Sequence, residues 1–237
     1  MAAVAHIPYF SNILNRIIDI EMTGHWGHPI LMFPSSYGSY TQNRDFGLND
    51  TVMHFVDQGR IKLYNIETLD GWSFYAEHMS SENKIAHYEQ YLQFMVQELI
   101  PKIQQDCHTH RVAVAGCSFG GYHAGNIAFR FPDLVSHLFS MSGVFNIRNL
   151  TPLSDDIRIY FNCPDEFVLN DESWKYNHMH VVLNTSDWDI CLSRNQHMHQ
   201  VLNSKGIAHW YDERKWIEHD WPLWKMVFPE YIQRYFS

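Results

Sequence analysis

The stretch "VAVAGCSFGGYHAGNIAFRFP", from Val112 to Pro132, joins a short apolar run to a helical segment through a glycine-rich turn. Residues 112–115 are apolar on both faces, which is typical of a strand buried inside a sheet. The segment after Gly120 has apolar residues at helical spacing and ends at Pro132, because proline cannot continue a helix. Ser118 therefore lies where a buried strand turns into a helix.

The turn itself fits the pattern G-x-S-x-G, in which a strained strand-to-helix turn holds a serine hydroxyl clear of the sheet. We expect a Cβ at Gly116 or Gly120 to collide in so tight a turn. The alternative is a glycine-rich turn with an incidental serine, such as a phosphate cradle at a helix N-terminus. The chain has no G-x-x-x-x-G-K-[ST] pattern and no acidic residue at the dinucleotide-fingerprint distance, so we favour a nucleophilic serine.

The bulk composition narrows the class of protein. A chain of 237 residues with 46% hydrophobic content suits one α/β domain over residues 1–237. The formal charge of −9 argues against nucleic acid or an anionic membrane as a partner, and the aromatic content of 15% permits a homo-oligomer. Without an 18-residue apolar stretch or a signal-peptide pattern, we expect a cytoplasmic protein. The scattered cysteines indicate reduced thiols: Cys107, Cys117, Cys163 and Cys191.

Short apolar runs alternate with helical stretches along the whole chain, which predicts an α/β fold with a mostly parallel central sheet and helices on both faces. The clearest helix spans residues 82–105, with Ser80 or Ser81 as its cap and Pro101 as a kink. In such sheets the site lies outside the carboxyl ends of the strands. The expected strands are Arg16–Glu21, Pro29–Phe33, Ile61–Ile66, Val112–Ala115, Leu138–Ser142, His180–Asn184 and His209–Asp212.

A serine nucleophile needs a base within hydrogen-bond reach and an acid that orients the base. With a G-x-S-x-G elbow, the chain order of these groups is serine, acid, histidine. Ser118, Asp189 and His219 have this order, and the last two follow predicted strands. The chain holds 16 histidines, so position rather than residue type selects His219.

The orienting acid has a rival two residues earlier, because Asp187 and Asp189 could both reach the histidine. We favour Asp189 because Trp188 and Ile190 are expected to pack its turn against the core. Its alternative role is that of a helix N-cap, which aspartate fills well.

A tetrahedral intermediate also needs two backbone N–H donors. One is expected from Phe119, directly after the nucleophile. The other is expected from the turn "PSSYG" after the strand at 29–33, where we favour Ser36 and keep Tyr37 as the alternative.

With these residues in place, the chain resembles the α/β-hydrolase superfamily, in its putative-esterase branch with esterase D, feruloyl esterases and mycolyltransferases. The resemblance spans Asn15 to Phe236 and is closest at "GCSFGG", "SDWDICLSRNQHMHQVLNSKGIAHWYDE" and "EHDWPLW", which look like small bacterial esterases. It implies a serine carboxylesterase with Asp189 and His219 at the acid and histidine positions. Where relatives often carry His-Gly this chain has Pro34-Ser35, and residues 146–178, which match nothing specific, are expected to form a small cap.

Other chemistries remain as alternatives to a hydrolase that acts on small-molecule esters. An acyltransferase or thioesterase would use the same three residues. A metal-dependent hydrolase would need the H-x-H pairs, but no H-E-x-x-H or H-x-H-x-D-H pattern accompanies them, so we assign no metal and no cofactor. A non-catalytic binding module usually lacks one triad residue, whereas all three are present here. The H-x-H pairs are His108 and His110, His178 and His180, and His197 and His199.

Overall fold

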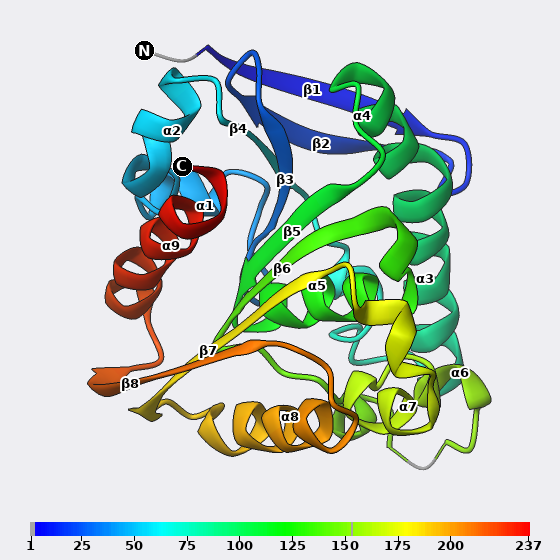
Figure 1. The fold of residues 1–237 in the computed structure, drawn as a ribbon. Coiled ribbons are helices and arrows are strands. Elements are labelled where there is room, and N and C mark those ends of the chain that lie inside the picture. The colour runs from blue at the N-terminus through cyan, green and yellow to red at the C-terminus, as the bar shows by residue number, and fades with distance from the viewer. Residues whose placement is uncertain (1–2, 153) are drawn as a thin grey trace.

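An eight-stranded sheet in the order β1-β2-β4-β3-β5-β6-β7-β8 forms the centre of the computed structural model, which describes residues 3–152 and 154–237 (Figure 1). The β1–β2 and β2–β4 pairs are antiparallel, and every other neighbouring pair is parallel. The predicted mostly parallel sheet is confirmed. The strands are β1 (Val4–Ser11), β2 (Arg16–Thr23), β3 (His28–Phe33), β4 (Ile61–Ile66), β5 (Val112–Cys117), β6 (Val135–Met141), β7 (His180–Trp188) and β8 (Trp210–Glu218).

Each predicted strand is present, but the last ones extend further than expected. The strand predicted at 180–184 continues to Trp188, and the one predicted at 209–212 continues to Glu218. Strand β1 was not predicted. It contains Pro8, which cannot donate a ladder hydrogen bond, and an apolar run that contains proline is a weaker candidate for a strand. Its place at the edge of the sheet is where such a residue is tolerated.

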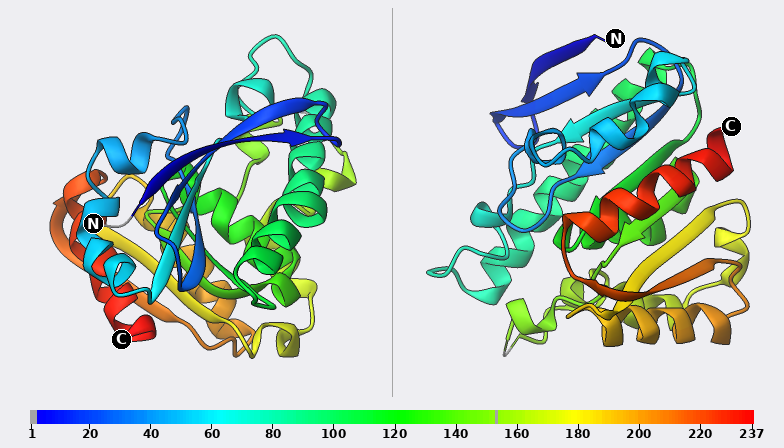
Figure 2. Two further views of the ribbon diagram at one scale, coloured as in Figure 1. Left: turned by 90° about the horizontal axis from the view of Figure 1, so that it is seen from above. Right: turned by 90° about the vertical axis from the view of Figure 1, so that its left-hand side faces the viewer.

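Helices cover both faces of the sheet (Figures 1 and 2). One apolar cluster includes Tyr122 of α5 and Leu138 of β6, and the other includes Phe55 of α2 and Phe228 of α9. The sheet is therefore buried on both sides, as its apolar strands require. The helices are α1 (Gln42–Asp45), α2 (Met53–Asp57), α3 (Ser81–Phe94), α4 (Ile100–Asp106), α5 (Phe119–Arg130), α6 (Ile157–Tyr160), α7 (Pro164–Asn170), α8 (Leu192–Ser204) and α9 (Trp221–Phe236).

The long helix predicted at 82–105 forms α3 and α4, joined by a π-helical segment, Met95–Leu99. The Ser80 hydroxyl accepts a hydrogen bond from the Asn83 N–H and caps α3, as expected. Pro101 is the second residue of α4, two positions after the last residue of the π-helical segment. The interruption thus occurs beside the residue that cannot donate to the helix ladder.

The four cysteines are free thiols, as the sequence indicates, and Cys117, Cys163 and Cys191 are buried. None of the helices described is long and apolar enough to cross a membrane. Residues 1 and 2 of the predicted domain and Leu153 of the predicted cap lie outside the described residues.

Candidate active site

The glycine-rich turn joins β5 to α5 and holds Ser118 in a left-handed conformation, with φ of +56°. A Cβ on Gly116 would lie 2.2 Å from the backbone of Gly120, and one on Gly120 would lie 2.4 Å from the Pro34 carbonyl oxygen. The predicted collisions are confirmed at both positions. The Ser118 N–H donates to the Met141 carbonyl at 2.9 Å, which fixes the turn against the end of β6.

Three side chains predicted from the sequence form one hydrogen-bonded chain at the carboxyl ends of the strands. His219 follows β8, and its Nε2 lies 2.9 Å from Ser118 Oγ. On the other side of the ring, Nδ1 lies 2.6 Å from Asp189 Oδ1. The rival Asp187 accepts the Trp216 N–H at 2.6 Å instead. The fold brings Asp189, and not Asp187, to the histidine.

Hydrogen bonds hold the Asp189 carboxylate from both sides. Oδ1 also accepts the Cys191 N–H at 2.7 Å, and Oδ2 accepts the Thr185 hydroxyl at 3.2 Å. Asp189 therefore caps the turn before α8 as well as contacting His219. The expectation that Trp188 and Ile190 pack this turn against the core is wrong, since they are 57% and 81% exposed. Polar contacts, rather than apolar neighbours, fix the carboxylate.

The charges of Asp189 and His219 follow from their surroundings. Burial alone would raise the pKa of Asp189, but hydrogen bonds from His219, Ser142 and the Cys191 N–H outweigh it and lower the pKa. Burial alone would lower the pKa of His219, but its contacts with Asp189 and Cys191 raise that pKa to about 9. Asp189 is thus a carboxylate that stabilises the imidazolium form of His219.

Ser142 and Trp224 extend this chain of hydrogen bonds, and neither was predicted from the sequence as part of the site. Ser142 has φ of +54°, hydrogen-bonds to Asp189 and accepts the Trp224 Nε1–H at 2.9 Å. The Trp224 ring contacts His219 edge to face, with ring centroids 5.3 Å apart. The strand end at 142–146 was a visible signal, but the conformation of Ser142 depends on its tertiary contacts.

The candidate backbone donors lie beside the serine. Phe119 is the first residue of α5, so its N–H has no helical acceptor four residues earlier. Ser36 lines the same cavity, and its hydroxyl lies 3.0 Å from the Tyr75 hydroxyl. Tyr37 is 66% exposed and stacks on the Tyr75 ring at 4.4 Å. Ser36 is thus among the residues that line the cavity, whereas Tyr37 is not.

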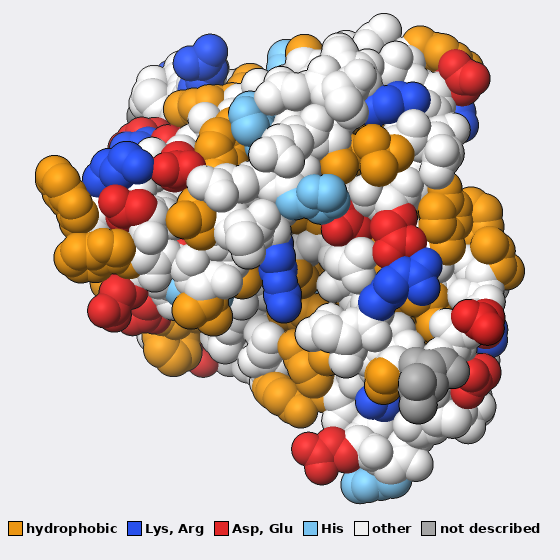
Figure 3. Space-filling model, turned by 90° about the horizontal axis from the view of Figure 1, so that it is seen from below, with side chains coloured by type: hydrophobic (Ala, Val, Ile, Leu, Met, Phe, Trp, Pro, Cys, Tyr) orange, Lys and Arg blue, Asp and Glu red, His pale blue; other side chains and the backbone are white. Residues whose placement is uncertain are grey.

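The cavity at Ser118 measures about 150 Å³. Typical ligand pockets are larger, roughly 300–1,000 Å³, so this one suits a short acyl group. The side of the molecule on which α8 lies has a hollow bordered by basic and hydrophobic side chains (Figure 3). Of the predicted cap, only its first few residues line the cavity, and α7 packs against α5 and α8 instead. The lining residues are Ser36, Tyr75, Ser118, Phe119, Val144, Asn146, Asn149, Leu150, Ile190, Cys191 and Arg194.

Metal-ligating groups gather at the same place. Among the described residues, one group of three could hold an ion: ligand atoms of Asp189, Cys191 and His219 lie within 4.8 Å of one another. Asp189 Oδ1 and His219 Nδ1 already bond each other, so a cation would have to displace that hydrogen bond. Members of two H-x-H pairs have other partners: His178 Nε2 lies 2.9 Å from the Pro132 carbonyl oxygen, and His199 Nδ1 lies 2.7 Å from His209 Nε2.

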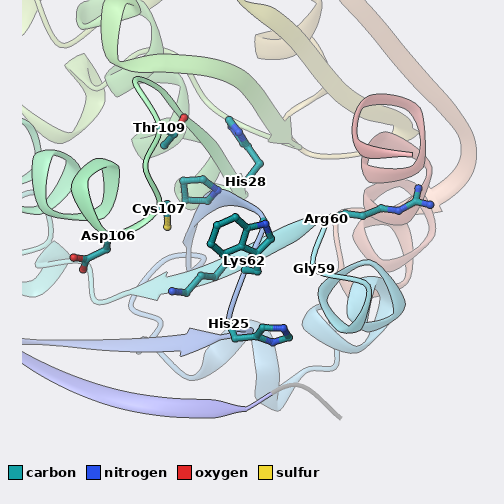
Figure 4. Close-up of a pocket in the computed structure, with 11 residues that line it drawn as sticks. His25, His28, Gly59, Arg60, Lys62, Asp106, Cys107 and Thr109 are labelled. Carbon is teal, nitrogen blue, oxygen red and sulfur yellow. The ribbon is translucent and has the colours of Figure 1, made fainter.

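Larger hollows, of about 340 and 360 Å³, lie away from the serine. Figure 4 shows the first, at the amino ends of β3 and β4, where His28 and Lys62 line it. Its Arg60 side chain runs toward α9 and donates to the Phe236 carbonyl at 3.4 Å. Sites in open α/β sheets lie at the opposite, carboxyl edge, which favours the small cavity at Ser118.

Comparisons with known proteins identify the family and the fold. The family model described as "Putative esterase" matches residues 40–235. A ferulic acid esterase superposes with a TM-score of 0.79 at 17% identity, covering 97% of this chain and 96% of that one. The S-formylglutathione hydrolase of Staphylococcus aureus superposes with a TM-score of 0.79 at 12% identity, covering 100% of both chains.

The fluorophosphonate-binding serine hydrolase F of Staphylococcus aureus superposes with a TM-score of 0.73 at 13% identity, covering 100% of this chain and 99% of that one. A search of curated protein sequences found no match. The structural matches show the fold, and the family match spans most of the chain. The chain therefore belongs to the putative esterase family, as a carboxylesterase-type hydrolase with the α/β-hydrolase fold.

Proposed function

We propose that the protein hydrolyses small carboxylic esters through an acyl-enzyme on Ser118, with His219 as general base and Asp189 as the acid that orients it. One observation carries the proposal: the hydrogen-bonded chain runs from Ser118 Oγ to His219 Nε2 at 2.9 Å and from Nδ1 to Asp189 at 2.6 Å. With Nδ1–H donated to the carboxylate, Nε2 is left as the acceptor that a serine proton needs.

In the acylation step, Ser118 Oγ bonds to the ester carbonyl carbon while its proton moves to His219 Nε2. The carbonyl electron pair moves to oxygen, and we assign the Phe119 and Ser36 N–H groups as donors to that oxyanion. The C=O bond then re-forms, the bond to the alcohol oxygen breaks, and the alcohol leaves with the proton from His219. Asp189 lowers the energy of the imidazolium present between these two transfers.

In the deacylation step, water gives a proton to His219 and its oxygen attacks the acyl carbon. Collapse releases the carboxylic acid, and Ser118 recovers its proton from His219. A thioester fits the same steps with a thiol as the leaving group. That alternative is favoured by the structural similarity to an S-formylglutathione hydrolase.

A fluorophosphonate probe tests the serine mechanism, and the structural neighbour named for binding this reagent class supports its choice. We expect one adduct by intact mass and complete loss of hydrolysis of p-nitrophenyl acetate. The Ser118→Ala variant should take up no probe and lose activity on the order of 10⁶-fold. Excess chelator should leave wild-type activity unchanged, since His219 and Asp189 already satisfy each other.

Two outcomes would contradict the proposal. One is a Ser118→Ala variant that hydrolyses the ester at the wild-type rate. The other is activity that chelator removes and zinc restores. Running p-nitrophenyl acetate beside matched thioester and amide substrates identifies the leaving group that the site prefers.

A further inference from the structure

An arginine lines the cavity that contains the nucleophile. Arg194 lies in the first turn of α8, three residues after Cys191, so the two side chains occupy the same face of the chain there. Its positive charge acts on the phenol of Tyr75, which reaches the cavity from the segment after β4. Arg194 and Tyr75 therefore line the same cavity as Ser118, and the charge of the arginine reaches the phenol.

This arginine has no counter-ion among the described residues. Most other arginines have a carboxylate partner, as Arg148 does in its ion pair with Glu166 at 2.6 Å. The acids that contact lining residues already have partners: Asp165 and Glu166 accept hydrogen bonds from the Asn146 amide at 2.9 Å, and Asp189 contacts His219. A guanidinium has five N–H donors and stays charged, so its donors at Arg194 are free for a ligand.

A second hydrogen-bond donor lines the same cavity. Asn149 is exposed, lines the same cavity, and makes no hydrogen bond with any described residue. An amide and a guanidinium together suit a carboxylate, because both of its oxygens can accept at once. The formal charge of −9 means that the protein as a whole repels anions, so a local cation is needed where one is to bind.

We propose that Arg194 binds a carboxylate of the substrate, an inference that rests on the proposed ester hydrolysis. The enzyme therefore acts preferentially on small esters that carry a negative charge near the scissile bond. The cavity of about 150 Å³ limits how far that charge can lie from the carbonyl. This makes Arg194 a specificity-determining residue, which binds the substrate without entering the bond changes.

Matched ester pairs test this directly. The acyl pair is p-nitrophenyl hemisuccinate against p-nitrophenyl butyrate, and the alcohol pair is 4-acetoxybenzoate against 4-acetoxybenzamide. We expect wild type to favour the charged member of at least one pair in kcat/KM. In Arg194→Gln, the charged-to-neutral ratio should fall on the order of 10- to 100-fold, mainly through KM, because a charge-assisted bond is lost. Arg194→Lys should recover part of the ratio.

The matched control is Arg16→Gln, which removes an exposed arginine at the start of β2, outside the cavity, and should leave the ratio unchanged. The proposal is overturned if wild type shows no charge preference in either pair, or if Arg194→Gln keeps the wild-type ratio. The proposed function fails separately, when wild type hydrolyses none of these esters and Ser118 takes up no fluorophosphonate.

Discussion

Of the four histidine–aspartate pairs among the described residues, two have both side chains largely buried, and these two differ in what the second imidazole nitrogen contacts. His219 contacts Asp189 at 2.6 Å and presents Nε2 to a serine hydroxyl at 2.9 Å. His123 contacts Asp70 at 2.8 Å through Nε2, and its Nδ1 lies 3.2 Å from the hydroxyl of Tyr88. Ser118 lines a cavity, whereas the Tyr88 hydroxyl is buried in the core.

Burial explains why only one pair suits catalysis. The side chains of His123 and Asp70 are 1% and 2% exposed, and they line none of the cavities described above. Burial also raises the pKa of Tyr88, so its phenol stays protonated. This pair ties the segment after β4 to α5. The same two residue types therefore stabilise the fold in one place and activate a nucleophile in the other.

The largest expected effect comes from the acid at the site. Asp189→Asn should lower kcat roughly 10⁴-fold, because the amide favours the wrong tautomer of His219. Asp187→Asn is the matched control and should cost far less, since Asp187 contacts the Trp216 N–H instead. Steady-state kinetics on p-nitrophenyl acetate measures both. A crippled Asp187→Asn beside an active Asp189→Asn would reverse the assignment.

The buried pair should respond in stability rather than in rate. His123→Leu leaves the Asp70 carboxylate without its partner, and Asp70 Oδ2 is already buried without a hydrogen bond in the described structure. We expect the free energy of unfolding to fall by about 1–3 kcal/mol, measured by urea denaturation. The fall in kcat should be much smaller than in Asp189→Asn. Unchanged stability in His123→Leu would remove the contrast between the two pairs.

The pH dependence gives the smallest effect, on the order of tenfold for each pH unit on the acid limb. His219 must be neutral to accept a proton, and its contacts raise its pKa to about 9. We therefore expect kcat/KM to rise with pH through neutrality, with a midpoint above the ordinary histidine value. Asp189→Asn should shift that midpoint to lower pH, because the carboxylate no longer stabilises the imidazolium.

A profile that is flat from pH 5 to 8 while acylation limits the rate would contradict a histidine base. A midpoint that stays in place in Asp189→Asn would contradict the electrostatic role of the carboxylate. Either result would also weaken the distinction between the two pairs.

Much of the site could be predicted from short stretches of sequence, because hydrophobic pattern and backbone sterics determine the structure of those stretches. A buried strand, a glycine-rich turn and a helix follow one another without interruption around Ser118, so pattern and sterics predict the turn. The order of Ser118, Asp189 and His219 follows the order of the strands that carry them. Strand β1 was not predicted because Pro8 suggests the end of a strand. Only the pairing of β1 with β2 shows that this segment is an edge strand.

Polar contacts, some of them local and others between distant segments, decided what the sequence left open. Trp188 and Ile190 are exposed although they flank Asp189, because hydrogen bonds rather than apolar burial hold that turn. The sequence placed Ser142 at the end of a strand but assigned no role to it or to Cys191, since their contacts with Asp189 and His219 arise only when β6, β7 and β8 lie side by side.

The sequence by itself determined the fold class, the elbow at Ser118 and the order of the candidate triad, because these depend on hydrophobic period, glycine sterics and strand order. The tertiary structure alone decided between Asp187 and Asp189, separated the buried His123 pair from the accessible His219 pair, and left Arg194 without a counter-ion in the cavity. Those outcomes depend on distances between groups far apart in the chain, and hydrogen bonds and charge interactions form only at those distances.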